Sequence, residues 1–487
     1  MADEDSTSPK PFRVIVIGAG IVGLSLSHAL QLANIEHVVL EKHDKIVSLK
    51  GAALIIWPAV ARIFDQFGIL DRITKTTSPV DASYKRWPDG SLICRDDTMQ
   101  AVSKLFKIPS ILFDRQTCVS HLYEGLPDKS KIHTSRRLER IEQTGTGVRV
   151  HLADGSIEEG DMVIGADGVH SHVRKLMWDY ADKFEPGSIP QIDKDVMSFG
   201  EYRGLFGVST LPDNAQLGTS NTNMILGQDV TMLLFSQMGR AMWGITFKDE
   251  FQKAEQKGKA TEAEIEAVAE RFADLPMTKN ITLGDVWKTN ERHGLLYVEE
   301  GVLSKWHAGR IVLVGDSAHK MTADLGMGAN IAVESAVHLC NILHREFASN
   351  PTRRISTPDL AALFAEYQAG RHARAKEYVE TSGKLTRMNS YQSRFNYFFA
   401  GYLHKYIVPS QKAGLIESLS VAPKLDYAPT RTIDESAEGW HWMEKQEREK
   451  GKKGGWFKYM VWTSVVGVTA AYMARAGVPA LLMKLTM

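Results

Sequence analysis

The chain has 487 residues, of which 44% are hydrophobic and 24% charged, a composition typical of a globular protein with about two or three domains. Lys and Arg together number 58, as do Asp and Glu, so the formal net charge is zero and nothing indicates nucleic-acid binding. The three cysteines, Cys94, Cys118 and Cys340, lie far apart without a CxxC pair, which argues against a disulfide framework and a metal site and favours a reducing compartment.

The amino-terminal residues 1–11 are acidic and polar, and we predict a disordered tail there. They lack the basic and apolar regions of a signal peptide, so we expect the body of the protein to face the cytosol.

From Phe12 an apolar strand, a glycine-rich turn, an amphipathic helix and a second strand follow one another, which predicts a βαβ unit. Further strands are predicted at 147–154 and 161–167. We assign residues 12–195 to a first domain of the α/β class.

The middle of the chain, 196–300, is rich in strand-like runs such as VTMLLFSQM and AMWGITF, which predict a mixed β-sheet, and it includes a predicted helix at 260–275. A buried strand and a helix then return with RIVLVGDSAH at 310–319. We therefore predict that the first domain is interrupted by a substrate domain at 196–300 and resumes over 301–345.

Beyond residue 345 we predict a helical region at 346–408, a polar linker at 409–455 and an apolar tail at 456–487. Tyr459–Ala474 is a 16-residue stretch without charge, somewhat short of the roughly 20 residues that a span needs. Basic residues precede it: Lys445, Arg448, Lys450, Lys452, Lys453 and Lys458. This pattern predicts a membrane-associated tail, as one span or an interfacial hairpin, with the body on the cytosolic side. The alternative is an apolar helix packed on the protein itself.

The first motif is GxGxxG, formed by Gly18, Gly20 and Gly23 between a strand and a helix. Such glycines allow a tight turn, close approach of a pyrophosphate and close packing of helix on strand. The helix N-terminus offers N–H groups to the phosphate. Glu41 follows 18 residues after Gly23 and could accept both hydroxyls of an adenosine ribose. The motif predicts dinucleotide binding, without distinguishing FAD from NAD.

Two further motifs follow. DMVIGADGVHSHVRKLM holds a DGxxSxxR pattern beginning at Asp167, and GRIVLVGDSAHKMTADLGMGANIAVESA places Asp316 after a strand and Gly326 and Gly328 before a helix. Each has a purely structural alternative: the first as a turn with a surface Arg174, the second as a helix cap.

Together the three motifs, which span residues 12–345, resemble those of the FAD-dependent monooxygenases of the aromatic-hydroxylase (para-hydroxybenzoate hydroxylase-like) family. The resemblance implies an α/β fold in which a Rossmann-like FAD-binding domain is interrupted by a mixed β-sheet substrate domain. It implies FAD as cofactor, bound by Gly18, Gly20, Gly23, Glu41, Gly51, Ala52, Arg115, Asp167, Asp316, Gly326, Gly328 and Ala329.

In this family the residue matching Asp316 binds a ribityl hydroxyl, and the one matching Arg115 reaches the pyrophosphate. The helix that begins near Gly328 would face the pyrimidine edge of the flavin, where its dipole favours the negative charge of the reduced form. NADPH or NADH is implied as reductant. Because the chain has one GxGxxG, we expect the nicotinamide to dock transiently.

The chain departs from the family at Ala323, where a proline is usual, and Asp324 follows it. Arg203, in GEYRGLFG, matches an arginine that fungal phenol-hydroxylating members use on their substrate, and it is our catalytic candidate; a solvated strand position is the alternative. The tyrosine of those members has no counterpart in TMLLFSQMG at 231–239, which argues against a phenol.

The apolar tail resembles that of the fungal terpenoid and meroterpenoid epoxidase branch, which acts on membrane-soluble prenylated compounds. We therefore predict a monooxygenase that inserts one oxygen atom from O2 into a lipophilic secondary metabolite, by epoxidation of a prenyl or terpenoid alkene. The predicted partners are this small molecule, O2 and, through the tail, a membrane. Alternatives are an FAD-dependent oxidase or dehydrogenase, motivated by Ala323, a hydroxylase of an aromatic substrate, and a flavin-binding scaffold without activity.

Overall fold

The computed structural model describes residues 10–47, 53–197, 199–211, 217–253 and 260–453. The predicted tails at 1–11 and 456–487 therefore lie outside the described residues, except for residues 10 and 11. Among the helices of the described ranges, none is long and apolar enough to cross a membrane.

A six-stranded sheet forms the centre of the first domain, in the order β18-β19-β11-β1-β2-β7. Its strands are β1 (Arg13–Ile17), β2 (Glu36–Leu40), β7 (Ile132–His133), β11 (Met162–Gly165), β18 (His307–Ala308) and β19 (Ile311–Leu313). β1 pairs in parallel with both β2 and β11, and β11 pairs in parallel with β19. The strand at 311–313 thus rejoins a sheet that begins at residue 13.

Helices cover this sheet because its strands are apolar on both faces, as expected for a parallel sheet. α1 (Ile21–Leu32) and α10 (Gly328–Phe347) pack against each other, and strand residues such as Val16 and Val39 are fully buried. The α/β class is confirmed.

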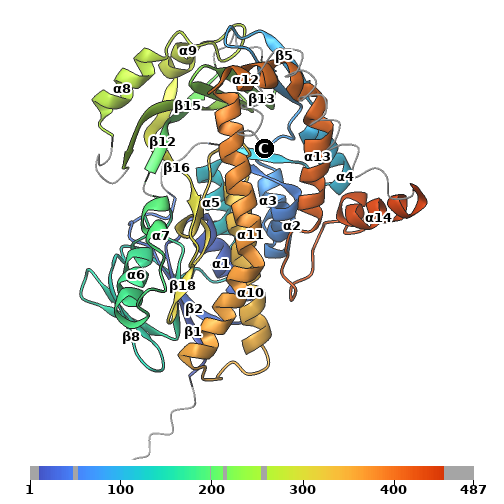
Figure 1. Ribbon diagram of the computed structural model, residues 1–487. Helices are drawn as coiled ribbons and strands as arrows, with labels where there is room; N and C mark the ends of the chain where they lie inside the picture. The colour runs from blue at the N-terminus through green and yellow to red at the C-terminus, as the bar shows by residue number, and fades with distance from the viewer. Residues whose placement is uncertain (1–9, 48–52, 198, 212–216, 254–259, 454–487) are drawn as a thin grey trace, which may run out of the picture.

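A seven-stranded sheet forms the upper part of Figure 1, in the order β16-β12-β15-β14-β13-β4-β5. Its strands are β4 (Ala82–Arg86), β5 (Leu92–Asp96), β12 (Phe199–Thr210), β13 (Asn221–Gly227), β14 (Val230–Gln237), β15 (Arg240–Lys253) and β16 (Asn290–Glu299). It is mixed, because β13 pairs in parallel with β4 and the other pairs are antiparallel. Two of its strands come from 82–96, so the sheet draws on more of the chain than the middle segment alone.

The two faces of this sheet have different neighbours. On one face Leu205, Leu234 and Trp243 form a separate apolar cluster with α8 (Glu262–Arg271) and α9 (Leu283–Lys288). On the other face Val208, Met242 and Phe235 pack with the main core. Since successive residues of a strand point to opposite faces, the odd-numbered residues of β12 from 203 onward face α8 and the even-numbered ones face the first domain.

The long helix α11 (Thr357–Asn389) links the two sheets, running from the lower to the upper part of Figure 1. Its buried Arg371 and partly buried Arg374 bind the fully buried Glu334 of α10, at N–O distances of 2.9 Å and 2.8 Å. Burial opposes ionisation of Glu334, but the two guanidinium groups lower its pKa below the ordinary value.

The remaining elements are short and connect these layers. They are β3 (Ala53–Ile56), α2 (Pro58–Phe67), α3 (Leu70–Thr74), α4 (Thr98–Phe106), β6 (Ile111–Asp114), α5 (Arg115–Glu124), η1 (Lys129–Lys131), β8 (Leu138–Gln143), β9 (Val148–Leu152), β10 (Ile157–Gly160), α6 (His172–Phe184), α7 (Gln191–Val196), β17 (Gly301–Val302), η3 (Gly315–Ser317) and β20 (His319–Lys320).

After α11 the chain forms α12 (Arg394–Phe398), the π-helical η4 (Phe399–Leu403), α13 (His404–Ser420), η5 (Glu438–His441) and α14 (Trp442–Lys453). The expectation of a linker at 409–455 therefore needs correction. Leu419 and Leu425 are buried, and the buried Asp65 of α2 accepts N–H groups of Arg431 and Thr432. The polar residues of this stretch bind the protein body. By composition alone such a stretch cannot be distinguished from a solvated linker.

Candidate active site

The turn between β1 and α1 brings the three motif glycines together. Gly18 has φ +101°, and a Cβ there would lie 2.7 Å from the carbonyl oxygen of Ala166. A Cβ on Gly23 would overlap the carbonyl oxygen of Gly18. Gly20 precedes α1, and no side chain caps the first turn of that helix. The turn therefore presents backbone N–H groups at a helix N-terminus, which suits a pyrophosphate.

Glu41 and Arg115 lie beside this turn. Glu41 follows the end of β2, where its Oε2 accepts the N–H of Ala19 and its Oε1 the N–H of His43, both at 2.9 Å. Each carboxylate oxygen keeps a further lone pair for a ribose hydroxyl. Arg115 begins α5, and its Nη2 lies 3.8 Å from the position of a Cβ on Gly20. The structure thus brings together the residues predicted for the adenosine and pyrophosphate end.

Gly51 and Ala52 lie outside the described residues, so their contribution stays a prediction. The strand that follows them, β3, supplies Ile55, whose side chain packs on Gly326.

The residues of the DGxxSxxR pattern form a network of hydrogen bonds at the start of α6. Asp167 accepts the hydroxyl of Ser171 at 2.5 Å and the N–H of His172 at 2.7 Å. Arg174 donates to the carbonyl oxygens of Val169 and Ser317, at 2.6 Å and 3.0 Å. The pattern therefore ties the end of β11 to the loop that carries Asp316. Asp167 accepts hydrogen bonds from the start of α6, and direct contact of Asp167 with a cofactor stays a prediction.

Asp316 lies after β19 with about a third of its side chain exposed, at 35%. Burial opposes its ionisation, but the Lys320 ammonium, 2.6 Å from Oδ2, and the nearby Arg115 lower the pKa of Asp316 below its ordinary value. The carboxylate is thus charged and positioned to accept hydrogen bonds from hydroxyl groups. Lys320 belongs to the third motif, but the spacing of that motif gave no sign of this ion pair.

The start of α10 holds the other predicted residues. Gly326 has φ +60°, Met327 precedes the helix without a side-chain cap, and Gly328 and Ala329 form its first turn. This N-terminus therefore leaves N–H groups for a ligand.

Asn330, which the sequence did not single out, fixes that turn. Its Oδ1 accepts the N–H of Trp57 at 3.0 Å, and its Nδ2 donates to the carbonyl oxygens of Ile55 and Gly326 at 2.8 Å and 3.0 Å. The signal was available, since Asn330 stands directly after the predicted Ala329 in GMGAN.

Asp324 is bound by the end of α11. Its Oδ2 accepts the hydroxyl of Thr386 at 2.5 Å and its Oδ1 the Nδ2 of Asn389 at 2.9 Å. Burial raises the pKa of Asp324, although both hydrogen bonds favour the ionised form. Lys85 of β4 lies close enough for its charge to act on Asp324, and burial lowers the pKa of this lysine.

Tyr202 continues the same network from the seven-stranded sheet. Its hydroxyl lies 3.0 Å from Oγ of Ser390, the residue after Asn389, and burial raises the pKa of Tyr202 to about 12. Sequence reasoning missed Thr386 and Asn389, because α11 shows no motif and only the fold brings its end to Asp324.

Arg203 is not brought to this place. Its guanidinium lies on the α8 face of the sheet, 3.6 Å from the carboxylate of Asp249 and 3.4 Å from that of Glu264, and over the ring of Tyr297. The cause is strand alternation: Tyr202 faces the first domain, so Arg203 faces away from it. The geometry gives no support to the predicted catalytic role.

His319 is buried and lies 3.3 Å from Oγ of Ser335, and burial lowers its pKa to about 4. It is thus neutral at physiological pH, which agrees with a structural role. Within the described ranges no group of His, Cys, Asp and Glu is arranged for a metal ion.

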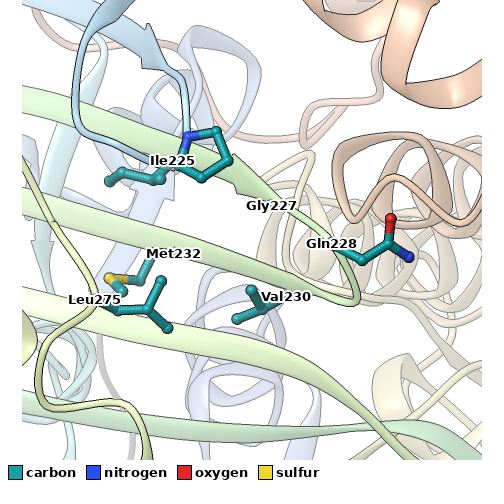
Figure 2. Close-up of a pocket in the computed structure, with 7 residues that line it drawn as sticks. Ile225, Gly227, Gln228, Val230, Met232 and Leu275 are labelled. Carbon is teal, nitrogen blue, oxygen red and sulfur yellow. The ribbon is translucent and has the colours of Figure 1, made fainter.

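Two cavities lie at the surface of the sheets. A polar cleft of about 400 Å³ runs along the start of α5, lined by residues that include Gln116, Arg240 and Arg292. An apolar pocket of about 190 Å³ lies at the turn between β13 and β14, where Figure 2 shows Ile225, Met232 and Leu275 around it. Ile225 and Met232 belong to the α8 face, so this pocket is separated from Asp324 by the sheet.

The residues present fit FAD on the evidence of this geometry. A glycine turn without room for side chains stands where a pyrophosphate would lie, a carboxylate stands where a ribose would lie, and Asp316 and the open N-terminus of α10 stand where a flavin would lie. The chemistry of these donors and acceptors matches the successive groups of the cofactor.

Comparison with known proteins agrees with this assignment. A family model described as "FAD binding domain" matches residues 12–382. The chain is 31% identical to the FAD-dependent monooxygenase atmM of Aspergillus flavus over 450 residues, 92% of each protein. It is 36% identical to the FAD-dependent monooxygenase andE of Emericella variicolor over 385 residues, 78% of this chain and 80% of andE.

Solved structures share the fold. Klebsiella pneumoniae HpxO, complexed with FAD and uric acid, aligns with a TM-score of 0.66 at 19% identity, covering 86% of this chain and all of HpxO. At this identity the similarity shows a common architecture.

Proposed function

The chain belongs to the FAD-dependent monooxygenases of the FAD binding domain family, and on that premise we propose that it inserts one atom of O2 into a lipophilic secondary metabolite, by epoxidation of a prenyl or terpenoid double bond. Because the monooxygenase class follows from the comparisons, the oxidase, dehydrogenase and scaffold alternatives are not carried further.

Bound FAD supplies the redox chemistry, accepting reducing equivalents from NADPH or NADH and activating O2. The protein supplies binding and orientation. The β1–α1 turn and Arg115 hold the pyrophosphate, Glu41 the ribose, and Asp316 the ribityl chain. The start of α10 offers its N–H groups to the edge of the flavin that becomes negative on reduction.

The observation that carries the proposal is the apolar character of the sheet face turned toward the flavin end. Val208, Met242 and Phe235 on this face pack with the main core of the first domain. Of these three residues Val208 and Met242 are buried, whereas Phe235 is only partly buried, so a hydrocarbon substrate that packs on the Phe235 ring buries apolar surface at roughly 25 cal/mol per Å². This supports a prenyl or terpenoid group as the part of the substrate nearest the flavin.

The position of Arg203 favours an alkene over a phenol. A phenol becomes reactive when its proton is removed and the phenolate is stabilised, and Arg203 was the residue predicted to act on such a substrate. Its guanidinium instead binds Asp249 and Glu264 on the opposite face of the sheet. An alkene is already electron-rich and needs no such group.

The experiment is turnover under 18O2 with NADPH, using a panel of prenylated aromatic compounds and terpenoid alkenes. The expected product carries one 18O atom in an epoxide, with consumption of one NADPH per product. A product labelled on an aromatic ring would show a hydroxylase of an aromatic substrate. An unlabelled product from every compound would contradict oxygen insertion.

The apolar tail at 456–487 supports a second part of the proposal, attachment to a membrane with the body in the cytosol. The segment has few charges and follows a cluster of basic residues. Deleting residues 456–487 is expected to make the protein extractable by an alkaline carbonate wash while its flavin absorbance is kept. If the shortened protein resists that wash, this tail is not the anchor.

A further inference from the structure

Large apolar side chains gather on the surface formed by α12, η4 and the start of α13. Phe395 is 53% exposed, Tyr402 49% and Tyr406 71%. Tyr397, Phe398 and Leu403 on the same three elements are 44%, 39% and 37% exposed. We name these six residues the aromatic face. A soluble protein seldom exposes so many large apolar side chains within 12 residues unless the surface binds something.

The aromatic face is held outward by a rigid support. The ring of Trp87, which follows β4, lies with its centroid 5.6 Å from that of Tyr397 and 5.4 Å from that of Tyr402. A Cβ on Gly401 would overlap the Trp87 ring, so the π-helical segment lies directly on it. Behind this layer Leu226, Tyr391 and Ala400 are buried as one cluster. In Figure 1, α12 lies at the top, beside β13 and β5.

We propose that the aromatic face seats on the surface of a lipid bilayer and that lipophilic substrate enters the protein beside it. Tyrosine combines an apolar ring with a polar tip and concentrates at the depth of lipid headgroups, and the phenylalanine rings beside it add apolar surface that can enter the acyl region. Arg394, at the start of α12, is exposed and suits anionic headgroups. This proposal rests on the proposed function in the chemistry of the substrate and in the attachment of the tail to a membrane.

The fold connects the aromatic face to the candidate active site over a short distance of chain. Asn389 donates to Asp324, Ser390 lies 3.0 Å from the Tyr202 hydroxyl, and Tyr391 belongs to the buried cluster under the aromatic face. These three consecutive residues end α11 and begin the turn to α12. The end of α11 is thus in contact both with the residues at the flavin end and with the support of the aromatic face, which places the proposed entry of substrate beside this turn.

The end of the chain supports a bilayer as the occupant. α13 and α14 follow the aromatic face, α14 ends at Lys453, and the apolar residues 456–487 follow. Five basic residues lie in α14, where Glu444, Glu447 and Glu449 alternate with them and Lys445 and Arg448 pair with Glu438 and Glu444. From Lys450 to Lys458 the sequence carries four lysines and no acidic residue, and this stretch complements an anionic lipid surface. A chain tethered in this way holds its aromatic face at the same bilayer, so the tether and the aromatic face would act on one surface.

The experiment uses the full chain with an environment-sensitive fluorophore on an introduced cysteine. Phe395→Cys and Tyr402→Cys report on the aromatic face. Phe184→Cys, on α6 at 59% exposure, is the matched control, and the unsubstituted protein labelled in the same way is the blank. Vesicles of phosphatidylcholine, with and without phosphatidylserine, are added, and quenching by spin-labelled lipids locates the probe.

Vesicles are expected to cause a blue shift and lipid quenching at positions 395 and 402 and none at 184. Phosphatidylserine is expected to strengthen both effects. If the fluorophore on the aromatic face stays in water while the protein floats with the vesicles, the tail alone binds lipid and the proposal is wrong. A blue shift at 395 and 402 that is already present without lipid would show coverage by the chain's own tail or, if it depends on protein concentration, by a second copy, and would also overturn it.

A second measurement separates this proposal from the proposed function. The double variant Phe395→Ser and Tyr402→Ser is expected to keep its FAD and its NADPH-dependent turnover of substrate presented in detergent. For substrate presented in vesicles its KM is expected to rise several-fold with kcat unchanged. An equal KM in both presentations would contradict the entry of substrate at this face, whichever oxygenation product is found.

Discussion

The adenosine end and the flavin end of the candidate cofactor site are built in different ways. The adenosine end comes from the unbroken stretch β1–α1–β2 together with Arg115, and its main contributors are backbone groups and glycines. The flavin end is assembled from β3, the start of α10, the end of α11 and the seven-stranded sheet, and the hydrogen bonds that join them link residues 65 to 275 positions apart. A site built from the backbone of one segment produces a recognisable motif in the sequence. A site built from side chains of distant segments does not.

The first way to break the adenosine end is Gly23→Ala. The new Cβ would overlap the carbonyl oxygen of Gly18, so the turn and α1 cannot keep their positions. We expect purified protein without flavin absorbance and with reduced soluble yield, the largest effect of any variant considered. Gly145→Ala, where a Cβ would meet nothing within 4 Å, is the matched control and should keep its FAD. Stoichiometric FAD in Gly23→Ala would show that the backbone of the turn can shift to admit the new methyl group and still bind the cofactor.

The support of the flavin end is tested by Glu334→Ala. Removal of Glu334 leaves the buried Arg371 and the partly buried Arg374 without their carboxylate, at an expected cost of about 3–5 kcal/mol of unfolding free energy. Denaturant unfolding measures it. The exposed pair Arg345–Glu366 joins the same two helices at 2.7 Å, so Glu366→Ala is the control and should cost at most about 1 kcal/mol.

The loss of unfolding free energy caused by Glu334→Ala should depend on pH in one direction. Since the folded protein lowers the pKa of Glu334, its contribution is present at neutral pH and is lost as the pH falls through the folded-state value. The deficit of Glu334→Ala should therefore shrink in acid. A deficit independent of pH would mean that packing, and not charge, holds the two helices.

The same contrast explains what the sequence predicted. The GxGxxG turn, Glu41, the return of the chain at β19 and the α/β class follow from periodicity and spacing, which act over a few residues. Asn389, Thr386 and Tyr202 act at the flavin end only because α11 and β12 are packed there. Arg203 shows the limit clearly, since its neighbour in sequence faces the flavin end and a one-residue change of register reverses every side chain.

A smaller effect is expected from Glu41→Gln. The amide keeps an acceptor for the ribose but loses the charge, and a hydrogen bond to a charged group is stronger by about 1 kcal/mol or somewhat more. FAD affinity should therefore fall by roughly tenfold, since about 1.4 kcal/mol is one decade. Fluorescence titration of the flavin-free protein measures it. Glu36→Gln, at the other end of β2 and paired with Lys131, should leave FAD affinity unchanged.

The smallest effect on stability is expected from Asp324→Asn, which tests the flavin end at the departure next to Ala323. Asparagine has the same shape and can bond to Thr386 and Asn389 after rotation of the hydroxyl, so at acidic pH the free energy of unfolding should change by less than about 1 kcal/mol.

Burial raises the pKa of Asp324, so the folded protein binds this proton more tightly than the unfolded chain does. Stability linked to Asp324 is then lost as the pH rises from the unfolded to the folded pKa. Asp324→Asn escapes that loss and should gain stability relative to the parent over this range. If the free energy of unfolding of the parent instead rises above that of Asp324→Asn over this range, the carboxylate of Asp324 is ionised beside Lys85. The flavin end then holds a charged carboxylate, as Glu41 is proposed to be at the adenosine end.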